Sequence, residues 1–139
     1  MYKHKTHRAK TVLKVQSEES LHKSICDYLK VQYPKIIFNS DMSGIKLTKG
    51  QAVKASKLRS NKGFPDIAIY EPRGEFHGLF VELKKEGEVL YKRNGEAVTE
   101  HVQDQINCIN ILRAKGYCAG FAIGWNEAKT VIDSYLKLE

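Results

Sequence analysis

Three side chains that could carry out chemistry, Asp66, Glu82 and Lys84, fall in two short and largely apolar segments of the sequence. The segments, residues 66–70 and 79–84, have the alternating pattern of β-strands with one buried face. A turn containing Pro and Gly joins them, so we expect the two strands to be antiparallel neighbours. Their apolar side chains must share the core face, which places the two carboxylates and the ammonium together on the other face.

Two carboxylates on one sheet face are costly unless a positive group binds between them. A divalent cation would remove the repulsion, and hard oxygen ligands without His or Cys favour Mg²⁺ or Mn²⁺ over Zn²⁺. Lys84 could then steer a water or stabilise charge on a phosphoryl oxygen. The Glu-x-Lys spacing recurs at Glu127 and Lys129 in a segment predicted to be helical. The strand context of Glu82 therefore distinguishes the candidate metal site.

A helix over residues 18–32 is predicted to bring a further carboxylate to this site. Ser17 is a suitable N-cap, and acidic residues in the first turn complement the helix dipole. Glu18 is in helical phase with Leu21 and Ile25, so we expect it on the buried stripe, whereas Glu19 is rotated away. Glu18 is therefore the candidate ligand, with a helix-capping role as the alternative.

A second helix is predicted over residues 100–115, ending at Gly116. Its inward stripe includes Gln105, which places an amide against the sheet, while Gln103 turns outward. A buried amide needs hydrogen-bond partners, and a carboxylate or water of the site would serve. The alternative is a satisfied core amide.

The remaining elements complete an α/β domain with a mixed central β-sheet flanked by helices. A two-residue hairpin is expected about Asn94 and Gly95. The other predicted elements are a strand at 36–38, a short basic helix at 51–58, a strand at 117–124 and a helix at 126–137.

The chain has 139 residues, the size of one domain, and 42% of them are hydrophobic, which excludes a disordered tail. No apolar run is long enough to span a membrane, and the charged N-terminus lacks a signal-peptide core, so we expect a cytoplasmic protein. The cysteines, Cys26, Cys108 and Cys118, lack metal-binding spacing and are predicted to be reduced core residues.

Positive charge is concentrated in two acid-free blocks, residues 1–14 and 42–65, within a chain of net charge +7. Such blocks favour binding to a polyanion, because each phosphate contact releases counterions. A solvated surface that aids solubility is the alternative. The first block is predicted to be a mobile arm over 1–16, preceding the domain at 17–139. The candidate phosphate-binding residues of the second block are Lys46, Lys49, Lys54, Lys57, Arg59 and Lys62.

The ordered set of motifs resembles the VRR-NUC branch of the PD-(D/E)XK nuclease superfamily, especially its stand-alone phage and bacterial members. The resemblance covers about residues 17–130. The residues that carry it are Glu18 and Leu21, Gly63–Ile67, Phe80–Lys84, and Gln105 followed by Leu112, Gly116 and Tyr117.

This resemblance implies a restriction-endonuclease-like core and a Mg²⁺- or Mn²⁺-dependent endonuclease. Glu18, Asp66 and Glu82 would surround the metal ion with the Leu83 carbonyl as a further ligand, Lys84 would lie at the nucleophilic water, and Gln105 would orient the site. Stand-alone members are similar in architecture to Holliday-junction resolvases, which implies a homodimer that cuts branched DNA in a bacterial or phage-infected cytoplasm.

Two histidines bear on this resemblance. His22 departs from the family, which often has Gln there, and this puts a contact beside the metal site in doubt. His101, one turn before Gln105, is a candidate for a phosphate or water contact, with an exposed helix position as the alternative.

Two other classes of function remain open on the residues alone. A catalytically silent nucleic-acid-binding module accounts for the basic blocks but gives no reason for Asp66, Glu82 and Lys84 to share a face. A small-molecule hydrolase on a similar scaffold has no need for the excess positive charge.

Overall fold

The computed structural model describes residues 14–41 and 46–139. Most of the predicted basic arm, residues 1–13, lies outside the described residues, as do residues 42–45 of the second basic block. The elements in chain order are α1 (Glu18–Gln32), β1 (Phe38–Ser40), α2 (Lys49–Lys57), β2 (Ile67–Ile69), β3 (Leu79–Lys84), α3 (Glu100–Ala114), β4 (Cys118–Ile123) and α4 (Trp125–Leu136).

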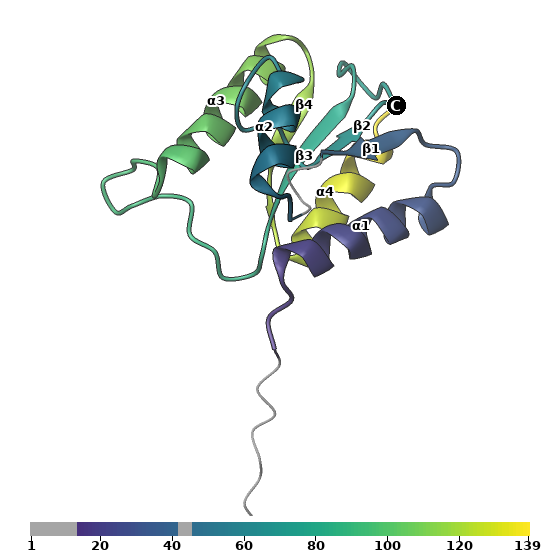
Figure 1. The fold of residues 1–139 in the computed structure, drawn as a ribbon. Helices are drawn as coiled ribbons and strands as arrows, with labels where there is room; N and C mark the ends of the chain where they lie inside the picture. The colour runs from purple at the N-terminus through teal and green to yellow at the C-terminus, as the bar shows by residue number, and fades with distance from the viewer. Residues whose placement is uncertain (1–13, 42–45) are drawn as a thin grey trace, which may run out of the picture.

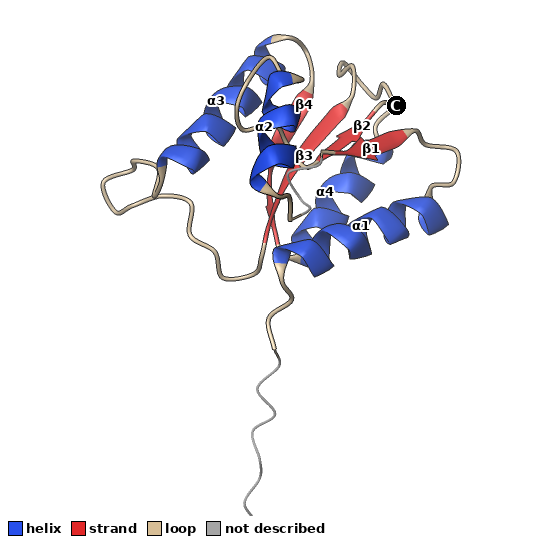
Figure 2. Cartoon of the chain, in the orientation of Figure 1, coloured by secondary structure: helices blue, strands red, loops and turns tan. Residues whose placement is uncertain are grey.

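The strands form a four-stranded mixed sheet in the order β1-β2-β3-β4 (Figure 2). β2 pairs antiparallel with both β1 and β3, and Ile67 lies opposite Val81. β3 pairs with β4 in parallel, which requires the long crossover that α3 provides. The predicted α/β class, the mixed sheet and the antiparallel pairing of the two site-bearing strands are confirmed.

Helices cover both faces of the sheet (Figure 1). On one face α1 and α4 pack on Leu79, Val81 and Leu83 of β3, and these residues belong to the larger hydrophobic core. On the other face α3 packs on β4, and Phe80 contributes to a smaller core with Ile109. Because side chains alternate along β3, Glu82 and Lys84 point to the same face as Phe80, toward α3.

Two predicted elements differ from the structure. The strand expected at 36–38 begins at Phe38, because a turn hydrogen bond from the Ile36 N–H to the Tyr33 carbonyl occupies the preceding residues. The hairpin about Asn94 and Gly95 has one bridge, Tyr91 to Ala97, and no flanking strands. The chain turns about Asn94 and Gly95 as predicted, but a hydrogen bond from the Lys92 N–H to the Glu96 carbonyl leaves three residues in the loop, so the predicted loop length of two was wrong.

A close contact fixes the loop between α2 and β2 against α3. Gly63 has φ +75°, and a β-carbon at this position would lie 2.5 Å from the backbone nitrogen of Gln105. Only glycine permits both the backbone angle and this approach. The loop that follows the basic helix α2 is thereby held beside the residue that we expect to orient the site.

The cysteines are all free, as predicted, but only Cys108 is fully buried; Cys26 and Cys118 are half-buried. In the described part of the chain, no helix has the length and apolar character needed to cross a membrane.

Candidate active site

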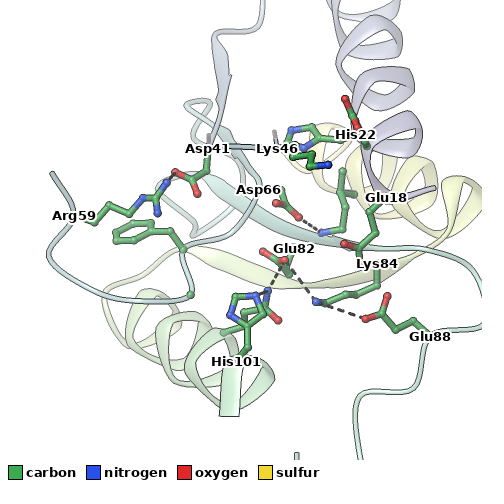
Figure 3. A pocket seen from close by; sticks show the side chains of 15 residues that line it. Glu18, His22, Asp41, Lys46, Arg59, Asp66, Glu82, Lys84, Glu88 and His101 are labelled. Carbon is green, nitrogen blue, oxygen red and sulfur yellow. Dashed lines mark hydrogen bonds and ion pairs between the residues drawn. The ribbon is translucent and has the colours of Figure 1, made fainter. Parts of the chain in front are cut away.

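Asp66 and Glu82 are brought together at the start of β2 and near the end of β3. Asp66 directly precedes β2 and is buried, and its Oδ2 accepts a hydrogen bond of 2.8 Å from the Leu83 N–H. This bond holds the Asp66 carboxylate against the backbone of β3, one residue from Glu82 (Figure 3). The clustering predicted from strand alternation is therefore present in the fold.

Gln105 connects helix α3 to this pair. Its Nε2 donates a hydrogen bond of 2.7 Å to Oε1 of Glu82 and lies 3.2 Å from Nε2 of His101. Gln105 is buried on the inward stripe of α3, as predicted, and Gln103 is exposed. Glu82 Oε2 and Gln105 Oε1 are both buried without a hydrogen-bond partner in the structure. Two unpartnered oxygens on adjacent side chains provide acceptor sites for a cation or a bound water.

Lys84 is buried between two carboxylates. Its Nζ lies 3.9 Å from Oε1 of Glu82 and 3.9 Å from Oε1 of Glu88. Glu88 was not predicted from the sequence. A turn after β3, closed by a hydrogen bond from the Glu88 N–H to the Lys85 carbonyl, returns this side chain toward Lys84. The four-residue separation of Lys84 and Glu88 could have indicated this contact, but such a separation brings two side chains together only if the chain turns between them.

Glu18 reaches the site from the first turn of α1, but it is not on the buried stripe. Leu21, Ile25 and Leu29 are buried, whereas Glu18 is exposed, so the predicted burial was wrong. At the helix N-terminus the side chain extends along the cavity wall instead of into the core. Partial burial, reinforced by a hydrogen bond with Glu88, raises the pKa of Glu18 above its ordinary value.

The buried carboxylates hold protons more tightly than they would in water. Burial, followed by the nearby charge of Asp66, raises the pKa of Glu82 well above its usual range. Burial also raises the pKa of Asp66, although the hydrogen bond from the Leu83 N–H and the closeness of the Glu82 carboxyl oppose the rise. A cation bound between the two carboxyl groups would relieve the same repulsion between their ionised forms.

These residues line one cavity of about 450 Å³. Its wall is acidic, although the whole chain has a net charge of +7. The Lys and Arg residues of the lining are Lys46, Arg59 and Lys84. The carboxyl side chains of the lining are Glu18, Glu19, Asp41, Asp66, Glu82 and Glu88. Carboxyl side chains outnumber these bases two to one, so a bound cation would ease the approach of an anionic substrate to the cavity.

The carboxylate oxygens of the site suit a hard divalent cation, but the protein side chains alone do not provide a complete set of ligands. Within residues 14–41 and 46–139, no group of three His, Cys, Asp or Glu side chains is placed to hold a metal ion. Asp66 and Glu82 nevertheless offer carboxylate oxygens, including one without a hydrogen-bond partner. Mg²⁺ is commonly held in this way, by one or two carboxylates with water and substrate oxygens as the other ligands.

The predicted phosphate-binding residues divide into two groups. Lys46, Arg59 and His101 line the cavity, and Arg59 forms an ion pair of 3.0 Å with Asp41 at its edge. The others are exposed and do not line the cavity; they are Lys49, Lys54, Lys57 and Lys62. The structure thus places part of the basic block at the mouth of the acidic site and part on the surrounding surface.

His22 also lines the cavity, projecting from α1 (Figure 3). It is buried, with 8% of its surface exposed, and its Nε2 has no hydrogen-bond partner in the structure. From the sequence, His22 stood out only as a departure from a family pattern. The structure places its imidazole in the lining of the same cavity as the carboxylates.

The sheet, the covering helices and the acidic cavity define an α/β domain with a nuclease-like fold. A solved structure of a VRR_NUC domain protein matches this chain with a TM-score of 0.61 and 26% sequence identity, covering 91% of this chain and 93% of that chain. No protein-family model and no curated protein matches the sequence. The chain has the fold of the VRR-NUC nuclease domain family, which confirms the resemblance inferred from its motifs.

Proposed function

We propose that the protein is a Mg²⁺- or Mn²⁺-dependent endodeoxyribonuclease that hydrolyses phosphodiester bonds in branched DNA. The observation that carries the proposal is the convergence of Asp66, Glu82, Lys84 and Gln105 in one acidic cavity, with an unpartnered oxygen on Glu82 and another on Gln105. The fold shared with a VRR_NUC domain protein supports the same class of reaction.

Asp66 and Glu82 would hold the cation, with the Leu83 carbonyl and Glu18 as further oxygen ligands. A bound divalent cation supplies charge neutralisation and a more acidic bound water. Gln105 fixes the orientation of the Glu82 carboxylate through its 2.7 Å hydrogen bond. Lys84 places a buried positive charge beside Glu82, where it would stabilise negative charge that develops on the phosphoryl oxygens.

The basic residues at the mouth suit a backbone-binding role. Arg59 and Lys46 stand at the edge of the cavity, where they could contact phosphates on either side of a scissile bond. Such contacts position DNA without reading its sequence, so selectivity for a four-way junction would depend on DNA shape. Two symmetric cuts in a junction require two active sites, so a homodimer is part of the proposal.

A catalytically silent DNA-binding module is the second candidate, favoured only by the basic residues around the cavity. It leaves the burial of Asp66, Glu82 and Lys84 unexplained, because buried ionisable groups are costly and add nothing to phosphate binding.

Cleavage of labelled DNA separates the two candidates. The purified chain would be incubated with a four-way junction, a 5′ flap and linear duplex, each with Mg²⁺, Mn²⁺ or EDTA. We expect metal-dependent incision, strongest on the junction and at symmetric positions, with a dimeric mass in solution. Salt-sensitive DNA binding without incision in either metal would favour the binding module instead.

A further inference from the structure

A second cavity, of about 780 Å³, lies between α1 and β1. The proposed nuclease chemistry makes no use of it. Its lining includes a thiol, an imidazole and a hydroxyl, from Cys26, His22 and Ser40, together with Lys23 and Lys30. A nucleophilic sulfur therefore lies in an open cavity beside a potential base, the combination that activates cysteines in proteins.

The geometry around Cys26 holds the thiol between polar groups. Its Sγ lies 3.1 Å from the Ser40 hydroxyl, a contact that joins α1 to β1. His22 precedes Cys26 by four residues on α1, so the two side chains lie on the same face of the helix. His22 is more than nine-tenths buried and lines this cavity, and its Nε2 has no hydrogen-bond partner. The imidazole is thus positioned beside the thiol with a ring nitrogen left for a further group.

The electrostatics distinguish Cys26 from the other cysteines. Burial raises the pKa of the Cys26 thiol, but hydrogen bonds with His22 and Ser40 and the charges of His22 and Lys30 outweigh it, so the net pKa is lowered. Interaction with Cys26 likewise raises the pKa of His22, against the effect of burial. Burial raises the thiol pKa of both Cys108 and Cys118. The thiolate fraction is therefore largest at Cys26.

We propose that Cys26 is a modification site, a reactive thiol positioned by His22 and Ser40 that is attacked by small electrophiles and peroxides. With hydrogen peroxide, the sulfur forms a bond to one oxygen as the O–O bond breaks. The sulfur is oxidised to a sulfenic acid and the departing hydroxide takes a proton to leave as water. With an alkyl iodide, a carbon–sulfur bond replaces the carbon–iodine bond and iodide leaves.

The position of His22 gives this reaction a link to the first cavity. The same ring lines both the thiol cavity and the acidic cavity. Only the His22 side chain would consequently separate a modified Cys26 from the proposed nuclease site. The reactivity of Cys26 itself does not depend on nuclease activity.

Alkylation of the full-length chain tests the proposal. The native protein would be treated with limiting iodoacetamide at pH 7, and the labelled peptides quantified by mass spectrometry over time. Cys118 is the internal control, because it is also half-buried. We expect Cys26 to be labelled several-fold faster, because the pKa of its thiol is lowered whereas that of the Cys118 thiol is raised. Equal rates, or faster labelling of Cys118, would overturn the proposal.

Two further measurements test the positioning role and the oxidation. In His22→Gln we expect several-fold slower labelling of Cys26, with the rate at Cys118 unchanged. An unchanged labelling rate of Cys26 in a folded His22→Gln variant would show that His22 does not activate the thiol. Peroxide followed by dimedone should trap sulfenic acid at Cys26 and not at Cys118, and trapping at both to the same extent would contradict a selective site.

Discussion

The contact between Gly63 and α3 gives a quantitative prediction for Gly63→Ala. The added β-carbon would lie 2.5 Å from the carbonyl carbon of Asp104 and 2.5 Å from the nitrogen of Gln105, both backbone atoms. Neither can rotate away, so the loop or the helix must move. The φ of +75° adds strain, because residues other than glycine rarely adopt this conformation.

These two costs can be separated with matched glycines. Gly95→Ala carries only the backbone strain, since Gly95 has φ +86° and no atom within 4 Å of its added β-carbon. We expect it to lose about 1–2 kcal/mol. Gly50→Ala carries neither cost, lies in α2 and should be neutral or stabilising by up to about 1 kcal/mol. Gly63→Ala adds overpacking to the strain and should lose about 2–5 kcal/mol in total.

Urea denaturation followed by circular dichroism measures the three free energies of unfolding. Where Gly63→Ala still folds, we also expect reduced cleavage, because the movement shifts the backbone of Gln105, whose amide holds Glu82. A loss for Gly63→Ala no larger than that for Gly95→Ala would refute the reasoning, since the close approach would then carry no cost.

Other consequences concern charge. Glu82→Gln should raise the free energy of unfolding of the metal-free protein at pH 7, because burial raises the pKa of the Glu82 carboxyl and makes its ionised form costly. Because the pKa of Glu82 is raised in the folded state, its neutral carboxyl stabilises the fold at low pH, and this stabilisation is lost as the pH rises through that pKa. Between pH 4 and pH 8 the melting temperature should therefore fall less for the variant than for the parent chain. Burial would raise the pKa of Asp133, but a 2.6 Å hydrogen bond from Nζ of Lys129 to its Oδ2, together with 2.6 Å hydrogen bonds from Tyr28 and Tyr33, outweighs burial and lowers this pKa to about 2. Asp133 should contribute roughly 2 kcal/mol above pH 4, lost as pH falls toward 2, so acid unfolding curves of Asp133→Asn and the parent chain should converge at low pH. Arg59→Ala should weaken DNA binding and reduce the salt slope by about one, measured by fluorescence anisotropy, whereas the exposed Lys137→Ala should change neither. Equal effects of Arg59→Ala and Lys137→Ala on DNA affinity would contradict a DNA contact at the mouth of the cavity.

The parts of the fold and site that follow local periodicity could be predicted from the sequence. The alternation in residues 79–84 and the stripe around Gln105 each follow the repeat of a single element, and the structure reproduces both: Leu79, Val81 and Leu83 lie in one core and Phe80 in the other. Glu18 was misplaced because its helical phase points inward, while its position in the first turn leaves the side chain at the surface.

The contributions of Glu88 and Asp41 to the cavity could not be predicted. Each depends on a turn or loop returning toward the site, which no periodic pattern encodes. The role of Gly63 likewise requires knowing that α3 lies against the loop. Tertiary contacts of irregular segments are therefore the information that the sequence pattern lacked.

We propose that the carboxylate of Glu82, and not the Glu-x-Lys spacing as such, supports metal-dependent cleavage. The chain offers a matched control in Glu127, which has the same spacing to a lysine but is exposed on α4. The most direct measurement is the cleavage rate of a labelled four-way junction in Mn²⁺ for the parent chain, Glu82→Gln and Glu127→Gln. We predict incision by the parent chain and Glu127→Gln, none above the EDTA background for Glu82→Gln, and a folded state for all three. Retained cleavage by a folded Glu82→Gln would contradict the account.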